Sequence, residues 1–398
     1  MRKPLKDVKV LDFTRLYAGP FCTMLLGDLG ADVVKVEAPG GDPIRRQGPP
    51  FHKGQSMSFL AANRNKRSIV LDLKSDEGRA AAQKLAAKCD VLVENFRPGV
   101  MARLGLGFRE LSAMNPRLIY ASMSGMGADG PGKDTGGFDL TIQAEAGYMS
   151  ITGERGCAPI KLGTSAFDLI CGQYAMGAIV TSLFDRERTG KGQLIETSLF
   201  EGCITFLVDA AVEYFSTGDS RGKWGSEHSS QAPYKAFKSA DGWIVIGAGI
   251  QNLFEGFMRV IDREDLIADE RFLSVADRSA NRDDLHAILD AEVLKWETDA
   301  LLAALREADV PCAPVNSIAE ALTHPQALHR GMIQTVAHPE YGDLKTLGPA
   351  VKYSGFDVSA NWTAPPLLGA DTDRVLDEWL GTSQPEPVGA SSDRKTAN

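Results

Sequence analysis

Short apolar runs alternate with segments of helical spacing through the first third of the sequence, and this alternation restricts the possible fold more than any other feature. Strands are expected at residues 8–13, 32–37, 89–94 and 117–122, and helices at 20–29 and 75–88. Strands that alternate with helices form parallel sheets with crossover helices. We therefore expect an α/β protein whose large domain holds a Rossmann-like, open, mostly parallel sheet.

The chain is long enough for two domains. Its 398 residues exceed the usual size of a single hydrophobic core. A stretch rich in Gly, Ser and charge at 218–231 suggests a boundary, and residues 234–248 predict a hairpin with Asp241-Gly242 as its turn. The expected organisation is a large domain in 1–220, a smaller α/β domain in 225–315, a return to the large domain in 316–380, and a disordered tail in 382–398.

The loops at the carboxyl ends of the expected strands are the natural place for a ligand, because open α/β sheets bind ligands there. Three basic residues, Lys74, Arg97 and Arg103, lie on or after these connections. Surface solvation explains any one of them, but together they suit the phosphates of a large anionic ligand. The loops concerned span 15–20, 37–48, 95–99 and 124–137.

One carboxylate stands out in the segment 161–190. A Gly-Thr-Ser turn opens a long predicted helix, and Asp168 falls in its first turn as the only charged side chain between Lys161 and Asp185. We predict that Asp168 is a nucleophile. The structural alternative is that Ser165 and Asp168 form an S-x-x-D capping pattern, which on this stretch alone is the commoner arrangement. An aspartate normally titrates near ~3.9, so we expect Asp168 to be ionised at neutral pH and able to attack without a separate base.

Composition argues against several other classes of protein. A net charge of −9 and a pI near 5.3 disfavour a general nucleic-acid binder. The six cysteines form no C-x-x-C pair and suggest reduced thiols in a cytoplasmic protein. The six histidines lack metal-ligand spacing, so we expect no metal site; we also expect no membrane span or membrane partner.

A G-x-G-x-x-G pattern at Gly125, Gly127 and Gly130 follows an expected strand. A dinucleotide fingerprint needs a helix to begin at its third glycine, but Pro131-Gly132 follows here. We interpret the segment as a flexible glycine loop. The sequence also lacks a phosphate-binding G-K-[ST] loop and the G-x-S-x-G elbow of hydrolases.

Several segments, in order, resemble one family from about residue 4 to 380. They are L-K-D-V-K-V-L-D-F-T-R at 5–15, L-G-A-D-V-V-K-V-E at 29–37, N-K-R-S-I-V-L-D-L-K at 65–74, V-L-V-E-N-F-R-P-G at 91–99, F-D-L-I-C-G at 167–172, P-C-A-P-V at 311–315 and A-P-P-L-L-G-A-D-T at 364–372. Together they resemble the class III CoA-transferases of the CaiB/BaiF type, typified by formyl-CoA transferase.

The resemblance implies a CoA-transferase that moves CoA from an acyl-CoA donor to a free carboxylic acid. It implies Asp168 as the nucleophile, passing through an aspartyl–acyl anhydride and an aspartyl-CoA thioester. CoA and acyl-CoA are then substrates, with no tightly bound cofactor, and the fold is an interlocked homodimer. The residues implied in CoA binding are Tyr17, Ala18, Leu71, Lys74, Asn95, Phe96, Arg97, Arg103 and Asp139.

Some features of the resemblance leave alternatives open. Some members have an arginine where this chain has Ala38, so one phosphate contact is in doubt. Similar racemases place a histidine before the aspartate after the glycine loop, but Phe138 stands here and cannot transfer a proton. The other alternative is a catalytically inactive CoA-binding protein.

Two further segments bear on the reaction. The segments at 149–154 and 159–163 look more like the branch that uses succinyl-CoA and dicarboxylates. The loop at 247–249 is either a cover for the reacting groups or an ordinary turn.

Overall fold

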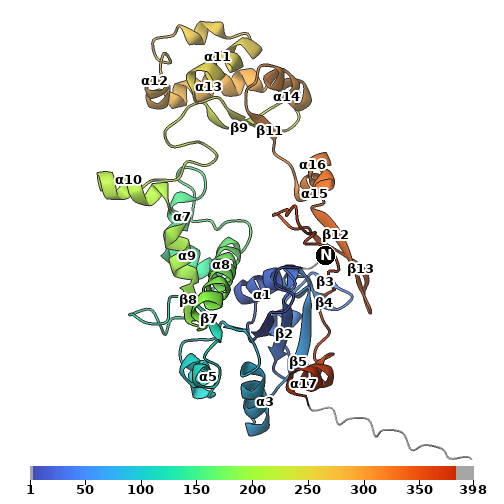
Figure 1. Ribbon diagram of the computed structural model, residues 1–398. Coiled ribbons are helices and arrows are strands. Elements are labelled where there is room, and N and C mark those ends of the chain that lie inside the picture. The colour runs from blue at the N-terminus through green and yellow to red at the C-terminus, as the bar shows by residue number, and fades with distance from the viewer. Residues whose placement is uncertain (1–2, 382–398) are drawn as a thin grey trace, which may run out of the picture. The chain divides into compact units, whose positions relative to one another are not determined.

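The structure is a computed structural model that describes residues 3–381, and it divides into two compact units (Figure 1). The first unit contains residues 3–142, Thr164–Phe206 and 331–381; the second contains Gln143–Gly163 and Leu207–Arg330. These bounds differ from the expected ones in three ways, the first being that the longer segment of the second unit already begins at Leu207 and not near 225. A segment before Asp168 belongs to the second unit, and the chain returns to the first unit at Gly331 instead of 316. The predicted disordered tail, 382–398, lies outside the described residues.

A six-stranded sheet forms the centre of the first unit, and every pair of neighbouring strands is parallel, which confirms the predicted parallel α/β sheet. Its strand order is β5-β2-β1-β6-β7-β8. The central strands are buried on both faces, which is why they are apolar runs without alternation. The strands are β1 (Lys9–Asp12), β2 (Asp32–Glu37), β5 (Lys66–Val70), β6 (Val91–Glu94), β7 (Ile119–Ser124) and β8 (Leu194–Ser198).

Helices pack on this sheet, and two hairpins also belong to the first unit. One core cluster joins Leu11, Val34 and Leu92 of the sheet to Leu85 of α3 and Trp379 of α17. The other elements of the first unit are α1 (Ala18–Asp28), η1 (Pro43–Arg46), β3 (Phe51–His52), β4 (Gln55–Ser56), α2 (Met57–Ala62), α3 (Asp76–Ala86), α4 (Val100–Arg103), α5 (Phe108–Met114), α8 (Ala166–Thr189), α9 (Leu199–Thr205), β12 (Ile333–His338), β13 (Gly342–Leu347) and α17 (Thr372–Leu380). Helix α6 (Asp139–Glu145) runs across the division between the units.

Helix α8 packs closely along α1. At Gly172 a Cβ atom would lie only 2.6 Å from the carbonyl oxygen of Ala18, so this approach requires glycine. Gly190 ends the helix in the left-handed conformation at φ 70°, and its N–H bonds to the carbonyl of Arg186. Helix α8 is long and apolar enough to cross a membrane by length and composition alone, a property that core helices of other proteins share.

The segment 199–217 forms two helices and not one. The chain breaks after α9, where Val208 adopts a φ of 41°, and α10 (Asp209–Thr217) follows. A positive φ is incompatible with a continuous right-handed helix. The G-x-G-x-x-G segment forms a loop with no helix before α6, as predicted.

The second unit is built on a three-stranded antiparallel sheet in the order β11-β10-β9. The predicted hairpin is confirmed, with its turn at Asp241-Gly242. Phe237, Ile244 and Ile246 of the sheet pack on Phe254 and Phe257 of a helix to form a separate core. The elements are α7 (Tyr148–Ile151), α10, β9 (Tyr234–Lys238), β10 (Trp243–Gly247), α11 (Gln251–Val260), η2 (Glu264–Ile267), α12 (Val275–Ala280), α13 (Arg282–Val293), α14 (Thr298–Glu307), β11 (Cys312–Pro314), α15 (Ile318–Thr323) and α16 (Pro325–His329).

Candidate active site

Asp168 lies in the first turn of α8, and a second carboxylate caps that helix. The Oδ2 atom of Asp139 accepts hydrogen bonds from the backbone N–H of Phe167 at 2.8 Å and of Asp168 at 3.4 Å. Ser165, by contrast, makes no capping bond with its side chain, so the S-x-x-D interpretation of the sequence is wrong. Because Asp139 satisfies the free N–H groups, the side chain of Asp168 is not needed to cap the helix.

The environment of Asp168 raises its pKa from the ordinary value of 3.8 to about 7. Burial of the partly exposed side chain is the main cause, and the negative charge of Asp139 adds to it. The expectation of an ordinary, fully ionised aspartate is therefore wrong. Helix N-termini favour a negative charge by only ~0.3–1 kcal/mol, which is too little to offset both effects.

Tyr17 and Ala18 lie alongside Asp168. Tyr17 is the N-cap residue of α1, and the contact between Ala18 and Gly172 brings the start of α1 next to the first turns of α8. Burial raises the pKa of the Tyr17 phenol, and the negative charge of Asp168 raises it further. The structure thus brings together Tyr17, Ala18, Asp139 and Asp168, four residues that were singled out from the sequence.

A second group lies at the carboxyl end of β6. The Asn95 side chain accepts a hydrogen bond from the backbone N–H of Arg15 and donates one to its carbonyl oxygen, both at 2.8 Å. The Arg15 guanidinium carbon lies 4.4 Å from the centre of the Phe96 ring. These contacts join the loops that follow β1 and β6. The two strands are neighbours in the sheet, but the chain continues from β1 to β2 on one side and from β6 to β7 on the other side. That crevice is where open α/β sheets bind ligands.

The other predicted CoA residues occupy separate loops. Arg97 is exposed and packs against Gly136 of the glycine loop, where a Cβ atom would lie 3.1 Å from its Nη2. Arg103 is exposed on α4. Lys74 is exposed in the loop after β5, which lies two strands away from β1 in the sheet. Leu71 of the same loop is buried, and its N–H donates to the carbonyl oxygen of Glu37. Near Ala38, Arg46 donates to the carbonyl of Gly40.

Sequence reasoning missed a buried charge network beneath these loops. The ammonium group of Lys35 is fully buried, donates to the carbonyl of Thr14 at 2.8 Å and forms an ion pair with Asp42 at 2.9 Å. Asp12 accepts from Thr14 and pairs with Lys66 at 3.1 Å. The signal was present as single charged residues inside apolar strands, which are costly to bury unless they are paired. The network fixes the backbone that precedes Arg15.

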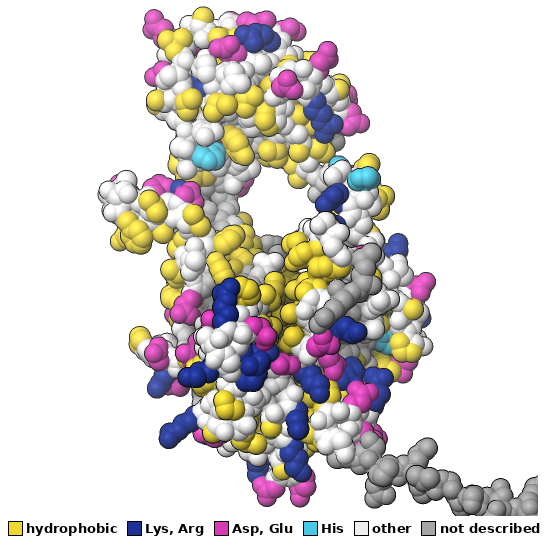
Figure 2. Space-filling model, viewed as in Figure 1, with side chains coloured by type: hydrophobic (Ala, Val, Ile, Leu, Met, Phe, Trp, Pro, Cys, Tyr) yellow, Lys and Arg dark blue, Asp and Glu magenta, His cyan; other side chains and the backbone are white. Residues whose placement is uncertain are grey.

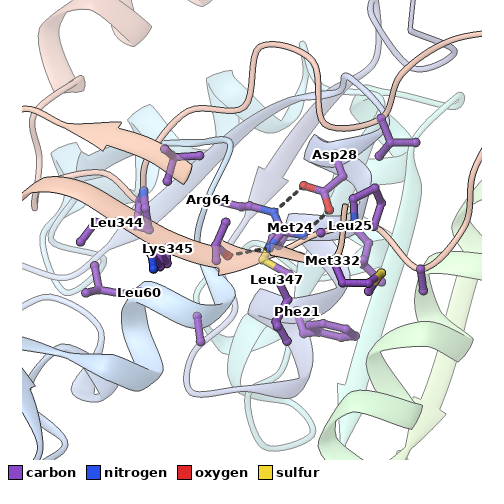
Figure 3. A pocket seen from close by; sticks show the side chains of 18 of the residues that line it. Phe21, Met24, Leu25, Asp28, Leu60, Arg64, Met332, Leu344, Lys345 and Leu347 are labelled. Atoms are coloured by element: carbon purple, nitrogen blue, oxygen red, sulfur yellow. Dashed lines mark hydrogen bonds and ion pairs between the residues drawn. The ribbon is translucent and has the colours of Figure 1, made fainter. Parts of the chain in front are cut away.

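A large apolar cavity of about 830 Å³ lies elsewhere in the first unit (Figure 3). Phe21 and Met24 of α1, Leu60 of α2, Met176 of α8 and Leu344 of β13 are among its lining residues. The ion pair between Arg64 and Asp28 lies at its edge, with 2.6 Å between Nη2 and Oδ2. The residues that line it do not include Asp168, so we do not assign the chemistry to this cavity.

The loop at 247–249 belongs to the second unit, where it lines a cavity of about 480 Å³. The N–H groups of Gly247 and Ala248 are bonded to the carbonyls of Pro311 and Pro233, and Arg278 donates to the carbonyl of Gly249 at 3.0 Å. The loop is thus an ordered segment after β10, and its role as a cover stays a prediction. Over residues 3–381, no group of three or more His, Cys, Asp or Glu is placed to hold a metal ion.

Comparison with known proteins decides the family. The model described as "CoA-transferase family III" matches residues 5–372. The chain belongs to CoA-transferase family III. It is 40% identical over 379 residues to the succinyl-CoA:glutarate CoA-transferase of Homo sapiens, covering 95% of this chain and 86% of that protein. It is also 40% identical to the acetyl-CoA:oxalate CoA-transferase of Acetobacter aceti, covering 89% and 90% of the two chains.

Solved structures agree with this assignment. A CaiB/BaiF family protein from Brucella suis superposes with a TM-score of 0.87 at 36% identity, covering 95% of this chain and all of that one. The predicted family is therefore confirmed, and the protein is a family III CoA-transferase. CoA-transferases use CoA thioesters as substrates.

Proposed function

We propose that this family III CoA-transferase moves CoA from succinyl-CoA to a free dicarboxylic acid, with Asp168 as the nucleophile. The donor and acceptor classes follow the 40% identity to succinyl-CoA:glutarate CoA-transferases of mouse and human. The observation that most supports this role is the position of Asp168 in the first turn of α8. Its carboxylate is partly exposed, is spared from capping by Asp139, and lies beside Tyr17.

The reaction is a series of acyl transfers. The Asp168 carboxylate attacks the thioester carbonyl, the C–S bond breaks, and an aspartyl–acyl anhydride and CoA thiolate form. The thiolate then attacks the aspartyl carbonyl and expels the donor acid, which leaves an aspartyl-CoA thioester. The acceptor carboxylate attacks this thioester, the C–S bond breaks, and a second anhydride and CoA thiolate form. The thiolate then attacks the acyl carbon of the acceptor and releases the Asp168 carboxylate, which gives the new acyl-CoA.

The raised pKa suits this chemistry. A carboxylate with a pKa of about 7 is more basic than an ordinary aspartate and is therefore the better nucleophile. It is still half ionised at pH 7. Each tetrahedral oxyanion needs donors. The Tyr17 phenol stays protonated because burial and Asp168 raise its pKa, so it keeps a proton to donate beside the reacting carbon.

The proposed CoA site is the carboxyl edge of the sheet in the first unit. Arg97, Arg103 and Lys74 supply exposed cations for the phosphates, and Asn95 and Phe96 shape the loop after β6. Leu71 is buried, so we infer that it supports its loop by packing instead of contacting CoA with its side chain. Arg46 can supply a cation in the loop where Ala38 replaces an arginine.

We further propose that the protein acts as an interlocked homodimer in the cytoplasm. Helix α10 and the residue before it expose a line of apolar side chains, with Val208 at 65%, Val212 at 61% and Phe215 at 80% exposed. Figure 2 shows hydrophobic side chains over α10. This line and the apolar cavity of the first unit supply the unpartnered surface that an obligate dimer buries.

The test compares Asp168→Asn with Asp185→Asn, which changes an exposed aspartate on the same helix. With succinyl-CoA as donor and glutarate as acceptor, Asp168→Asn should lose at least about 10³-fold in kcat, as removal of a covalent nucleophile does. Asp185→Asn should keep the wild-type rate. Hydroxylamine added during turnover should trap the wild-type acyl-enzyme at Asp168. Near-normal turnover by Asp168→Asn would show that the nucleophile lies elsewhere.

A further inference from the structure

Arg15 is a cation in the loop after β1, and its backbone is fixed on both sides. The Asn95 side chain bonds to both its N–H and its carbonyl oxygen. The next residue, Leu16, has a φ of 63° and donates its N–H to the buried carboxylate of Asp42 at 3.2 Å. Leu16 therefore adopts a left-handed conformation that the surrounding bonds maintain. These contacts fix the direction in which the Arg15 side chain leaves the loop.

The guanidinium group itself rests on an aromatic ring. It lies 4.4 Å from the centre of the Phe96 ring, a distance at which a cation and a ring attract each other. The N–H of Phe96 donates to Glu94 at 2.8 Å, and the other oxygen of Glu94 accepts from Ser122 at 2.5 Å. Glu94 is buried at the end of β6, so its hydrogen bond fixes the backbone of Phe96.

No carboxylate within the described residues forms an ion pair with Arg15. The nearest acidic influence on it is Asp42, whose oxygens are engaged by Lys35 and by the N–H groups of Leu16 and Ile44. An arginine stacked on a ring keeps its planar N–H donors at the edge of the stack, where they can bind an anion in bidentate fashion. Arg15 is exposed, so these donors face solvent.

We propose that Arg15 is an anion-binding residue of the substrate site, and that Asn95, Phe96 and Glu94 position it. This inference rests on the proposed function, because it takes the crevice between β1 and β6 as the place where acyl-CoA binds. Arg15 lies two residues before Tyr17, the residue beside the nucleophile.

The substrate has anionic groups in two places. A succinyl group ends in a free carboxylate, and the nucleotide part of CoA carries phosphates. Both match the guanidinium in charge and geometry. Three donors separate the two sources: succinyl-CoA has both groups, acetyl-CoA has the phosphates alone, and succinyl-pantetheine has the terminal carboxylate alone.

The experiment measures each donor with wild type, Arg15→Gln and Arg15→Lys, and with Arg109→Gln as control, since Arg109 is an exposed arginine on α5. KM is used where a donor turns over, and the inhibition constant or direct binding where it does not. Loss of a charged hydrogen-bonding partner should weaken binding about 10-fold to 100-fold. Arg15→Lys should recover part of the loss, because lysine keeps the positive charge but lacks the planar pair of N–H donors of the guanidinium group. Arg109→Gln should change nothing.

Two patterns support the proposal and identify the anion. Weaker binding of both succinyl donors, with acetyl-CoA unchanged, assigns Arg15 to the acyl carboxylate. Weaker binding of both CoA donors, with succinyl-pantetheine unchanged, assigns it to a phosphate. Unchanged binding of all three donors by folded Arg15→Gln, or a fall in kcat alone, overturns it. If Arg15→Gln fails to fold, Arg15→Lys carries the same comparison.

The outcome is separate from that of the proposed function. Direct binding of the three compounds tests Arg15 even if wild type transfers no CoA from succinyl-CoA. Conversely, a null result at Arg15 leaves the role of Asp168 intact.

Discussion

Removing the carboxylate of Asp168 should stabilise the protein at alkaline pH. The unfolded chain ionises this group near its ordinary pKa of 3.8, but the folded chain does so only near 7. Between those values the folded state binds the extra proton, so its stability falls as the pH rises through this window and the loss is complete above the folded pKa. Asp168→Asn has no proton to lose and escapes this penalty.

The size of the effect follows from the shift. A shift of about 3 pH units corresponds to about 4 kcal/mol, since each unit is worth about 1.36 kcal/mol. Because Asp168 is partly exposed, solvent screens some of this, and we take about 2 kcal/mol as the expected difference. With an unfolding entropy of about 2.1 cal/mol/K per residue over 398 residues, that corresponds to about 2–3 °C in Tm.

The assay is thermal unfolding of wild type, Asp168→Asn and Asp185→Asn at pH 5 and at pH 8. The Tm of Asp168→Asn relative to wild type should rise by about 1–2 °C between the two pH values, because more than a third of the window between 3.8 and 7 already lies below pH 5, while that of Asp185→Asn should stay constant. An equal difference at both pH values would refute the reasoning, because it would mean that Asp168 ionises in the folded protein as it does in the unfolded chain.

Three further changes test the surroundings of this carboxylate. Asp139→Asn should lower the pKa of Asp168, because it removes the neighbouring negative charge, and should move the acidic limb of the kcat–pH profile to lower pH; an unmoved limb would exclude the coupling. Gly172→Ala should cost about 1–3 kcal/mol in the free energy of unfolding and lower activity, because its Cβ would meet the carbonyl of Ala18, and denaturant unfolding measures this. Phe215→Ser should weaken the proposed dimer about 10-fold or more, read by sedimentation at decreasing concentration; an unchanged dimer would place the interface elsewhere.

The sheet could be predicted because its determinants are local. Each central strand is a short apolar run bounded by polar residues, and β2 matches its expected range of 32–37. Strand β5 was missed because its sequence, K-R-S-I-V, begins with two charged residues. Lys66 points into the buried network, where Asp12 balances its charge, and Arg67 pairs with Asp32. Only the folded chain supplies those partners, so the apolar pattern alone cannot show that this segment is a strand.

The position of Asp168 could be predicted, but its ionisation could not. Its place in the first turn of a helix is readable from the preceding Gly-Thr-Ser turn. Its pKa depends on Asp139 and on burial against α1, which come from segments 29 and about 150 residues away. Arg15 was overlooked for the same reason. The ring that supports it and the amide that fixes its backbone follow another strand, about 80 residues later.

The distribution of cations explains why two carboxylates near the ligand edge behave unlike those in the buried network. Burial alone would raise the pKa of Asp12 and Glu37, but the lysines around Asp12 and the Arg45 guanidinium on Glu37 outweigh it, and both pKa values are lowered. Asp168 and Glu94 have no such ion pair within the described residues, and burial raises the pKa of each to about 7. The cations that could neutralise them, Arg15, Arg97 and Arg103, are exposed and form no ion pair with any residue that the structure describes. The proposed site, which would bind an anionic thioester beside a reactive carboxylate, needs this separation, because an arginine paired with Asp168 would lower its pKa and make it a weaker nucleophile.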